Sequence, residues 1–133
     1  MAGPELVFVY GSLMRGLDLH HFMKAGVFAG EGSAEGALVS LGRYPGLVDG
    51  PGRVRGELYA FADLAAALDV LDDLEDYDAG DPDASMYLRV ARQIARDDGS
   101  TTLAWLYRYN RQTAGMPHVP GGDWRSAAAH SGS

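Results

Sequence analysis

The first sixty residues alternate between apolar runs and clusters of turn residues, a pattern typical of strands joined by loops. The run from Leu6 to Tyr10 is aliphatic, β-branched and aromatic and stops at Gly11, so it predicts a buried strand. Similar patterns predict strands from about Ser33 to Leu41 and from Arg53 to Phe61. The segment between them, Pro45–Gly52, is dense in glycine and proline and predicts a loop or a small hairpin.

The apolar pattern changes to a helical one after these strands. A helix is predicted from Asp63 to about Glu75, because its interior is alanine, leucine and acidic residues and because Asp63 suits the N-cap. A shorter helix is predicted from Leu17 to Ala25. The long helix therefore follows the strands directly, whereas the short one follows the loop after the first strand.

The last part of the chain returns to a strand pattern and then loses it. Residues 86–110 predict two strands joined by a turn at Asp97-Asp98-Gly99. Residues 126–133, which include "AAAHSGS", are expected to form a frayed tail. About five strands and one or two helices, without an internal repeat, predict a single domain over residues 1–133 with an α+β fold.

Composition and charge narrow the classes of function. The net charge is −7 and no basic stripe occurs, which argues against nucleic acid and against anionic membranes as partners. The chain has no cysteine, so disulfides, thiolate catalysis and cysteine-based zinc sites are excluded. The N-terminal residues lack the pattern of a signal peptide, and we expect a cytoplasmic protein. The oligomeric state stays open, with a monomer favoured.

One carboxylate of the predicted helix falls on its apolar side. Leu64, Leu68 and Leu71 form an apolar stripe, and Glu75 returns to this stripe eleven residues after Leu64. A desolvated glutamate has a raised pKa and can take and return a proton near neutral pH. Alternatively, the helix ends at Leu74 and Glu75 points to water. The neighbouring acidic face, which we expect to be solvated, comprises Asp69, Asp72, Asp73 and Asp76.

The loop from Gly11 to Gly16 allows several kinds of chemistry. Ser12 is not in the G-x-S-x-G pattern of a nucleophile, and the loop lacks the motifs of nucleotide-binding loops. It is either an ordinary turn or a cradle whose backbone N–H groups bind an anion or a carbonyl oxygen. No metal site is expected, because the four histidines do not have the spacing of ligands.

Two further side chains have open roles. Arg89 is either a surface residue or a bidentate donor to an anionic substrate. Tyr107 lies in an aromatic row with Trp105 and Tyr109, which either fills a barrel interior or lines a site.

Several motifs occur in one order along the chain. They are "VYGSL" (Val9–Leu13), "LDDLEDY" (Leu71–Tyr77) and "YLRV" (Tyr87–Val90), followed by "AWLYRY" and a late "GDW". From Val7 to about Trp124 the chain resembles the γ-glutamylcyclotransferase-like family, which includes γ-glutamylamine cyclotransferases and AIG2-like proteins. One departure is Asp76, which stands where the family usually has glycine after the glutamate.

The resemblance implies a small mixed or antiparallel β-barrel with a few packed helices. It implies that Glu75 is the catalytic acid/base and that the glycine-serine-leucine loop faces the same cavity. The reaction would release 5-oxoproline from a γ-glutamyl amine or amide by attack of the substrate's own α-amine, without a metal or cofactor. The implied substrate-binding residues are Tyr10, Gly11, Ser12, Leu13, Arg89 and Tyr107.

Two alternatives keep the fold and change the function. The first is removal of a γ-glutamyl protecting group in aminoglycoside or other natural-product biosynthesis. The second is a small-molecule-binding protein without catalysis, since a fold alone does not prove activity. The leaving group is not readable from the sequence, and segments Pro45–Gly52 and Gly115–Gly122 are expected to shape its end of the pocket.

Overall fold

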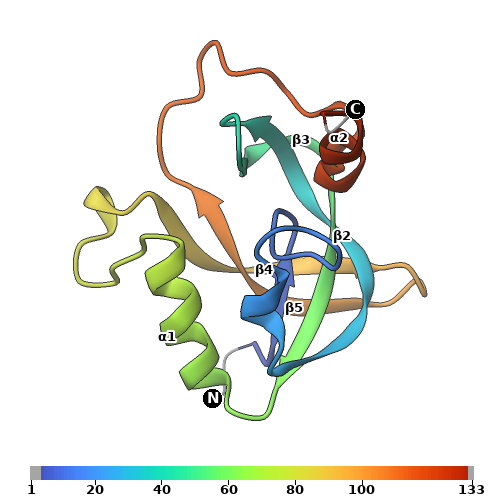
Figure 1. Ribbon diagram of the computed structural model, residues 1–133, viewed down its shortest axis with the longest axis vertical. Helices are drawn as coiled ribbons and strands as arrows, with labels where there is room; N and C mark the ends of the chain where they lie inside the picture. Colours follow the sequence, from blue (N-terminus) through green and yellow to red (C-terminus); the bar gives the residue numbers. More distant parts are fainter. Residues whose placement is uncertain (1–3, 132–133) are drawn as a thin grey trace.

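The computed structural model describes residues 4–131, with the side chains of 128–131 left out, and its centre is a closed β-barrel (Figure 1). The strands are β1 (Leu6–Val9), β2 (Gly26–Ser40), β3 (Pro45–Phe61), β4 (Tyr87–Arg96) and β5 (Thr101–Tyr109). Their order around the barrel is β1-β3-β2-β4-β5, and the pairing of β1 with β5 closes it. The predicted α+β fold with a small mixed barrel is confirmed.

The short first strand lies between two long ones. β1 pairs antiparallel with β3, where Phe8 lies opposite Leu58, and parallel with β5, where Leu6 lies opposite Ala104. Both edges of β1 are therefore bonded, and Val7 and Phe8 are at most 1% exposed. This explains why the run is continuously apolar instead of alternating. The loop that follows β1 leaves the barrel at a buried, fixed position.

The predicted loop at Pro45–Gly52 is instead the first half of β3, and this prediction was wrong. Ala37 pairs with Val48 and Glu35 with Arg53, so four residues of β3 lie opposite Gly36 alone. Gly50 and Gly52 have φ of 155° and 115°, where other residues are strained. The glycines and proline thus mark an irregular bulge within one strand rather than a reversal of the chain.

The two α-helices lie at different sides of the barrel, α1 at the lower left of Figure 1 and α2 at the upper right. Helix α1 (Leu64–Leu74) begins as predicted, with the side chain of Asp63 accepting a hydrogen bond from the N–H of Ala66 at 3.1 Å. The shorter helix expected at Leu17–Ala25 is reduced to a single 3₁₀ turn, His20–Met23. Two more 3₁₀ turns occur at Pro82–Ala84 and Pro120–Gly122.

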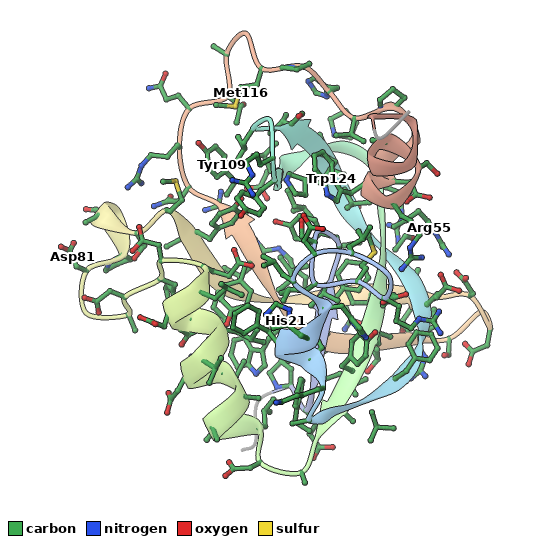
Figure 2. The ribbon with its side chains drawn as sticks, in the orientation of Figure 1. His21, Arg55, Asp81, Tyr109, Met116 and Trp124 are labelled. Atoms are coloured by element: carbon green, nitrogen blue, oxygen red, sulfur yellow. The ribbon has the colours of Figure 1, made fainter. Side chains whose placement is uncertain are left out.

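The C-terminal segment is more ordered than the sequence suggests. Residues 126–131, expected as part of a frayed tail, belong to helix α2 (Trp124–Ser131), and residues 132–133 lie outside the described part of the chain. Trp124 at the start of α2 is 8% exposed and belongs to the core beside the barrel (Figure 2). No helix within residues 4–131 is long and apolar enough to cross a membrane.

Candidate active site

A cavity of about 290 Å³ opens beside the end of β1. Four stretches of chain meet there: the loop after β1, the C-terminal end of α1, the start of β3 and the start of β4. Of the six residues predicted to bind substrate, five line this cavity, and so does Glu75. The lining residues are Phe8–Leu13, Leu19, Tyr44, Pro45, Leu74–Asp76, Met86, Tyr87 and Tyr107.

Glu75 is the residue at which α1 stops. The N–H of Asp76 donates to the carbonyl of Asp73 at 3.2 Å, and the N–H of Tyr77 donates to that of Asp72 at 2.9 Å. These two bonds form a Schellman motif, and they require the left-handed backbone found at Asp76, where φ is 54°. The helix therefore ends at Leu74, as the alternative expected, but Glu75 lies against the cavity instead of pointing to water.

The carboxyl group of Glu75 has an unusually high pKa for a glutamate. Burial raises its pKa from 4.5 to about 7. Among residues 4–131, no hydrogen bond or ion pair to its side chain offsets this cost. Since a group with this pKa is populated in both protonation states near neutral pH, Glu75 can accept a proton and donate it again.

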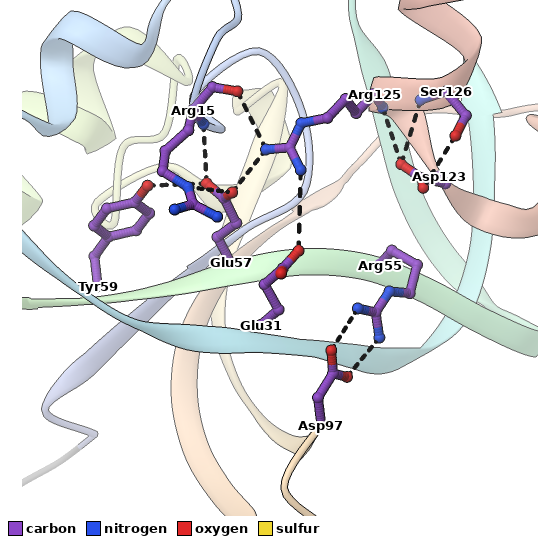
Figure 3. Close-up of polar contacts among 9 residues, drawn as sticks. All are labelled: Arg15, Glu31, Arg55, Glu57, Tyr59, Asp97, Asp123, Arg125 and Ser126. Atoms are coloured by element: carbon purple, nitrogen blue, oxygen red, sulfur yellow. Dashed lines mark hydrogen bonds and ion pairs between the residues drawn. The ribbon is translucent and has the colours of Figure 1, made fainter.

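Glu57 provides the internal contrast, because its side chain is fully buried yet charged (Figure 3). Burial alone would raise its pKa, but hydrogen bonds from Arg15, Arg125 and Tyr59 outweigh burial and lower the pKa. The backbone N–H and Nε of Arg15 donate at 2.9 and 3.0 Å, Arg125 Nη2 at 2.7 Å and the Tyr59 hydroxyl at 2.9 Å. Glu57 thus joins the loop after β1, strand β3 and helix α2.

The loop after β1 leaves its amide groups available. Its carbonyls are used: Gly11 accepts from the N–H of Met14 at 3.0 Å, and Ser12 accepts from that of Leu19 at 2.9 Å. The N–H groups of Gly11, Ser12 and Leu13 have no partner within the part of the chain that the structure describes. They are therefore free donors at the wall of the cavity.

Gly11 is needed for a steric reason. A Cβ atom at this position would lie 3.0 Å from Cγ of Pro45 and 3.1 Å from its Cδ. Because Pro45 is buried and lines the same cavity, a side chain at Gly11 would push the loop away from the start of β3. The glycine thus serves close packing at the site as well as the turn.

The two predicted tyrosines form walls whose hydroxyl groups are already occupied. Tyr10 donates to the carbonyl of Tyr107 at 2.6 Å and accepts from the N–H of Leu47 at 3.1 Å. Tyr107 in turn donates to Asp72 Oδ1 at 2.6 Å. Burial raises the pKa of both phenols, which makes them poor proton donors at neutral pH. These hydrogen bonds tie both rings to neighbouring parts of the fold.

Arg89 is the one predicted site residue that the structure does not bring to the cavity. Its Nε and Nη2 donate to the carboxylate of Asp72 at 2.9 and 3.2 Å, and its guanidinium carbon lies 4.7 Å from the centre of the Trp105 ring. Asp72, expected on a solvated face, is therefore only 19% exposed and paired. Arg89 is thus connected to the lining residue Tyr107 through Asp72.

Several lining residues were not singled out from the sequence as site residues. Tyr87 lies in the "YLRV" motif and donates to the carbonyl of Pro45 at 2.8 Å, so that motif was a usable signal. Tyr44 and Met86 are isolated apolar residues in loops and carry no such signal. Pro45 comes from a segment expected to shape the pocket, whereas nothing in residues 115–122 lines it. No group of three or more potential metal ligands occurs in residues 4–131.

Known structures share this arrangement of barrel and helices. An AIG2-like protein from Mus musculus superposes with a TM-score of 0.72 over 98% of this chain and 94% of its own, at 26% identity. The solution structure of protein ytfP from Escherichia coli has a TM-score of 0.61 at 34% identity, covering 92% of this chain and 98% of its own. The closed barrel with its packed helices is therefore a fold that other small proteins share.

Sequence comparison defines the class further. Residues 7–126 match the model of the family described as "Gamma-glutamyl cyclotransferase, AIG2-like", and the chain belongs to this family. It is 36% identical over 110 residues to the "Gamma-L-glutamyl-butirosin B gamma-glutamyl cyclotransferase" of Niallia circulans, covering 81% of this chain and 68% of the relative. It is 34% identical over 119 residues to the "Gamma-glutamylcyclotransferase family protein YtfP" of Escherichia coli strain K12, covering 89% and 94%.

Proposed function

We propose that the protein releases 5-oxoproline and a free amine from a γ-glutamyl amine or amide. The observation that carries this proposal is the pairing, in one cavity, of a glutamate whose pKa is about 7 with a loop of three free amide groups. A γ-glutamyl group contains an α-amine whose attack on its own γ-carbonyl carbon closes a five-membered ring, so the two reacting groups belong to one molecule. The protein then has to hold a folded conformer and move protons.

The chemical steps balance with Glu75 alone as acid and base. The carboxylate of Glu75 removes a proton from the α-ammonium group, and the resulting amine forms a bond to the γ-carbonyl carbon. The γ-carbonyl π electrons move to oxygen as the tetrahedral intermediate forms and return as the bond to the leaving nitrogen breaks. Glu75 delivers its proton to the leaving amine and, as a carboxylate again, takes the second proton from the nitrogen that attacked, which becomes the lactam nitrogen of 5-oxoproline. That proton passes to the released amine, which departs as an ammonium ion.

The loop amides supply the positive end of the site. No arginine, lysine or histidine is among the described residues that line the cavity. The N–H groups of Gly11, Ser12 and Leu13 are therefore the groups suited to bind the α-carboxylate of the substrate or the developing oxyanion. Tyr10 and Tyr107 would act as walls around the folded substrate, and Arg89 would hold Tyr107 in place through Asp72.

A second candidate function differs only in the leaving group. It is the removal of a γ-glutamyl protecting group from an aminoglycoside or another natural product. The observation in its favour is the 36% identity to the Niallia circulans relative, whose name gives γ-L-glutamyl-butirosin B as its substrate.

The proposal is tested by incubating the protein with γ-glutamyl amines and γ-glutamyl aminoglycosides and measuring 5-oxoproline. The control is each substrate with its α-amine acetylated, which removes the nucleophile and leaves the amide bond intact. We expect 5-oxoproline from the free amines and nothing from the acetylated ones. Release of glutamate instead would indicate hydrolysis and contradict the mechanism. Binding without any release would favour a non-catalytic function.

A further inference from the structure

The open end of the cavity has a distinct chemical character. Among the lining residues, three are exposed: Tyr44 at 42%, Met86 at 38%, and Asp76. The loop amides lie at the end of buried β1, whereas these three side chains face solvent. If the γ-glutamyl group binds at the loop and Glu75, the leaving amine extends past this rim. The rim residues are therefore the ones that contact the leaving group.

Asp76 supplies a free negative charge at this rim. Its N–H and carbonyl are used by Asp73 and Met86, but its carboxylate has no hydrogen bond or ion pair within residues 4–131. Asp72, by contrast, is paired with Arg89. Arg43 is the basic residue beside the rim, with its guanidinium carbon 5.8 Å from the centre of the Tyr44 ring, and it does not line the cavity.

The charges of the lining are therefore one-sided, with two carboxylates, Glu75 and Asp76, and no cationic side chain among the described residues. A second carboxylate on the substrate's leaving group would be repelled by Asp76, and an ammonium group would be attracted. An aromatic ring and a thioether next to a carboxylate also suit the alkyl chain and charged end of an aliphatic amine. A leaving group that is itself an amino acid fits this rim poorly.

We propose that the leaving group is an amine carrying a further cationic group, and that Asp76 is the residue that selects it. This inference rests on the proposed function and adds the class of the leaving amine to it. It also gives a reason for an aspartate at a left-handed position, where glycine would be the easier residue for the backbone.

The test uses three substrates of equal length that differ in one terminal group. They are the γ-glutamyl amides of 1,3-diaminopropane, butylamine and 4-aminobutanoic acid, in which the same three methylene groups end in an ammonium, a methyl and a carboxylate group. For the wild-type protein we expect kcat/KM to be highest for the ammonium compound and lowest for the carboxylate. An exposed charge pair supports a preference of about two- to fivefold between ammonium and methyl.

Two variants separate the charge of Asp76 from the fold. Asp76→Asn and Asp76→Gly both suit the left-handed backbone, and both should bring the ratio of ammonium to methyl kcat/KM close to one. The matched control is Asp69→Asn, which removes an exposed charge from α1 at a position outside the cavity and should keep the wild-type ratio. Asp76→Lys should reverse the order and favour the carboxylate compound.

Each contrary result has one meaning. Equal kcat/KM for the three compounds in the wild type would refute the inference and leave the proposed function intact. A wild-type preference for the carboxylate compound that disappears in Arg43→Gln would assign the rim to Arg43 and refute the inference. No 5-oxoproline from any of the three compounds would refute this inference, and the proposed function would fall only if the panel of γ-glutamyl amines and aminoglycosides also gave none.

Discussion

The raised pKa of Glu75 has a consequence for stability that needs no substrate. A carboxyl whose pKa rises from 4.5 in the unfolded chain to about 7 in the folded protein binds protons more tightly when folded. The contribution of Glu75 to stability is therefore fully present below pH 4.5, and it is lost as the pH rises toward 7. The loss is about 1.4 kcal/mol for each pH unit between these values, or about 3 kcal/mol in all.

The perturbation that isolates this effect is Glu75→Gln, which keeps the shape of the side chain and cannot ionise. We subtract the free energy of unfolding of the wild type from that of the variant at each pH. This difference should be larger at pH 8 than at pH 4.5 by up to about 3 kcal/mol. Taking the difference between the two pH values cancels the fixed cost of burying an amide instead of a carboxylic acid.

The assay is urea denaturation followed by circular dichroism at pH 4.5, 6 and 8, with the free energy of unfolding taken from linear extrapolation. The control is Glu35→Gln, since Glu35 is exposed and lies outside the cavity, and it should show no such pH dependence. If Glu75→Gln and the wild type differed by the same amount at every pH, Glu75 would have an ordinary pKa and the basis of the proposed chemistry would fail.

Three further changes probe the frame around the site. Glu57→Gln should lower the free energy of unfolding, measured in urea, by about 2–4 kcal/mol, because it weakens the hydrogen bonds from Arg15 and Arg125 to a buried carboxylate. A loss below about 0.5 kcal/mol would refute the role of Glu57 in joining these segments. Asp76→Gly should raise the free energy of unfolding by about 0.5–1 kcal/mol, since glycine tolerates a φ of 54° more easily than aspartate does. A less stable variant would contradict the strain expected at this position. Gly11→Ala should lower kcat/KM for a γ-glutamyl amine at least tenfold and lower the free energy of unfolding by about 1–3 kcal/mol, because its Cβ would lie 3.0 Å from Pro45. Unchanged kinetics would show that the loop does not need this close contact.

Sequence patterns predicted those helices and strands whose ends are set by neighbouring residues in the chain. The strand that stops before Gly11, the N-cap at Asp63 and the hairpin at Asp97-Asp98-Gly99 follow from short-range signals, and the structure contains all three. The first half of β3 was missed because Gly50 and Gly52 indicate a turn as readily as a bulge. Only pairing with β2 distinguishes the two.

The same holds for the site: residues in local motifs could be predicted from the sequence, whereas residues brought there by long-range contacts could not. Glu75 and the loop at Gly11–Leu13 were identified from a helical pattern and from family motifs, and they line one cavity. The role of Arg89 depends on Asp72, seventeen residues earlier, and no pattern in the sequence links the two. Tyr44 and Met86 enter the cavity because the barrel brings two loops together, which is a property of the whole fold.

The role of Glu75 as acid and base is tested by the rate of 5-oxoproline release from a γ-glutamyl amine, measured for the wild type and for Glu75→Gln across pH 5–9. We predict that kcat/KM of the wild type depends on a group with a pKa of about 7, and that Glu75→Gln loses about 10²–10⁴-fold in kcat while still binding the substrate. Release by Glu75→Gln at the wild-type rate, with the same pH profile, would contradict it.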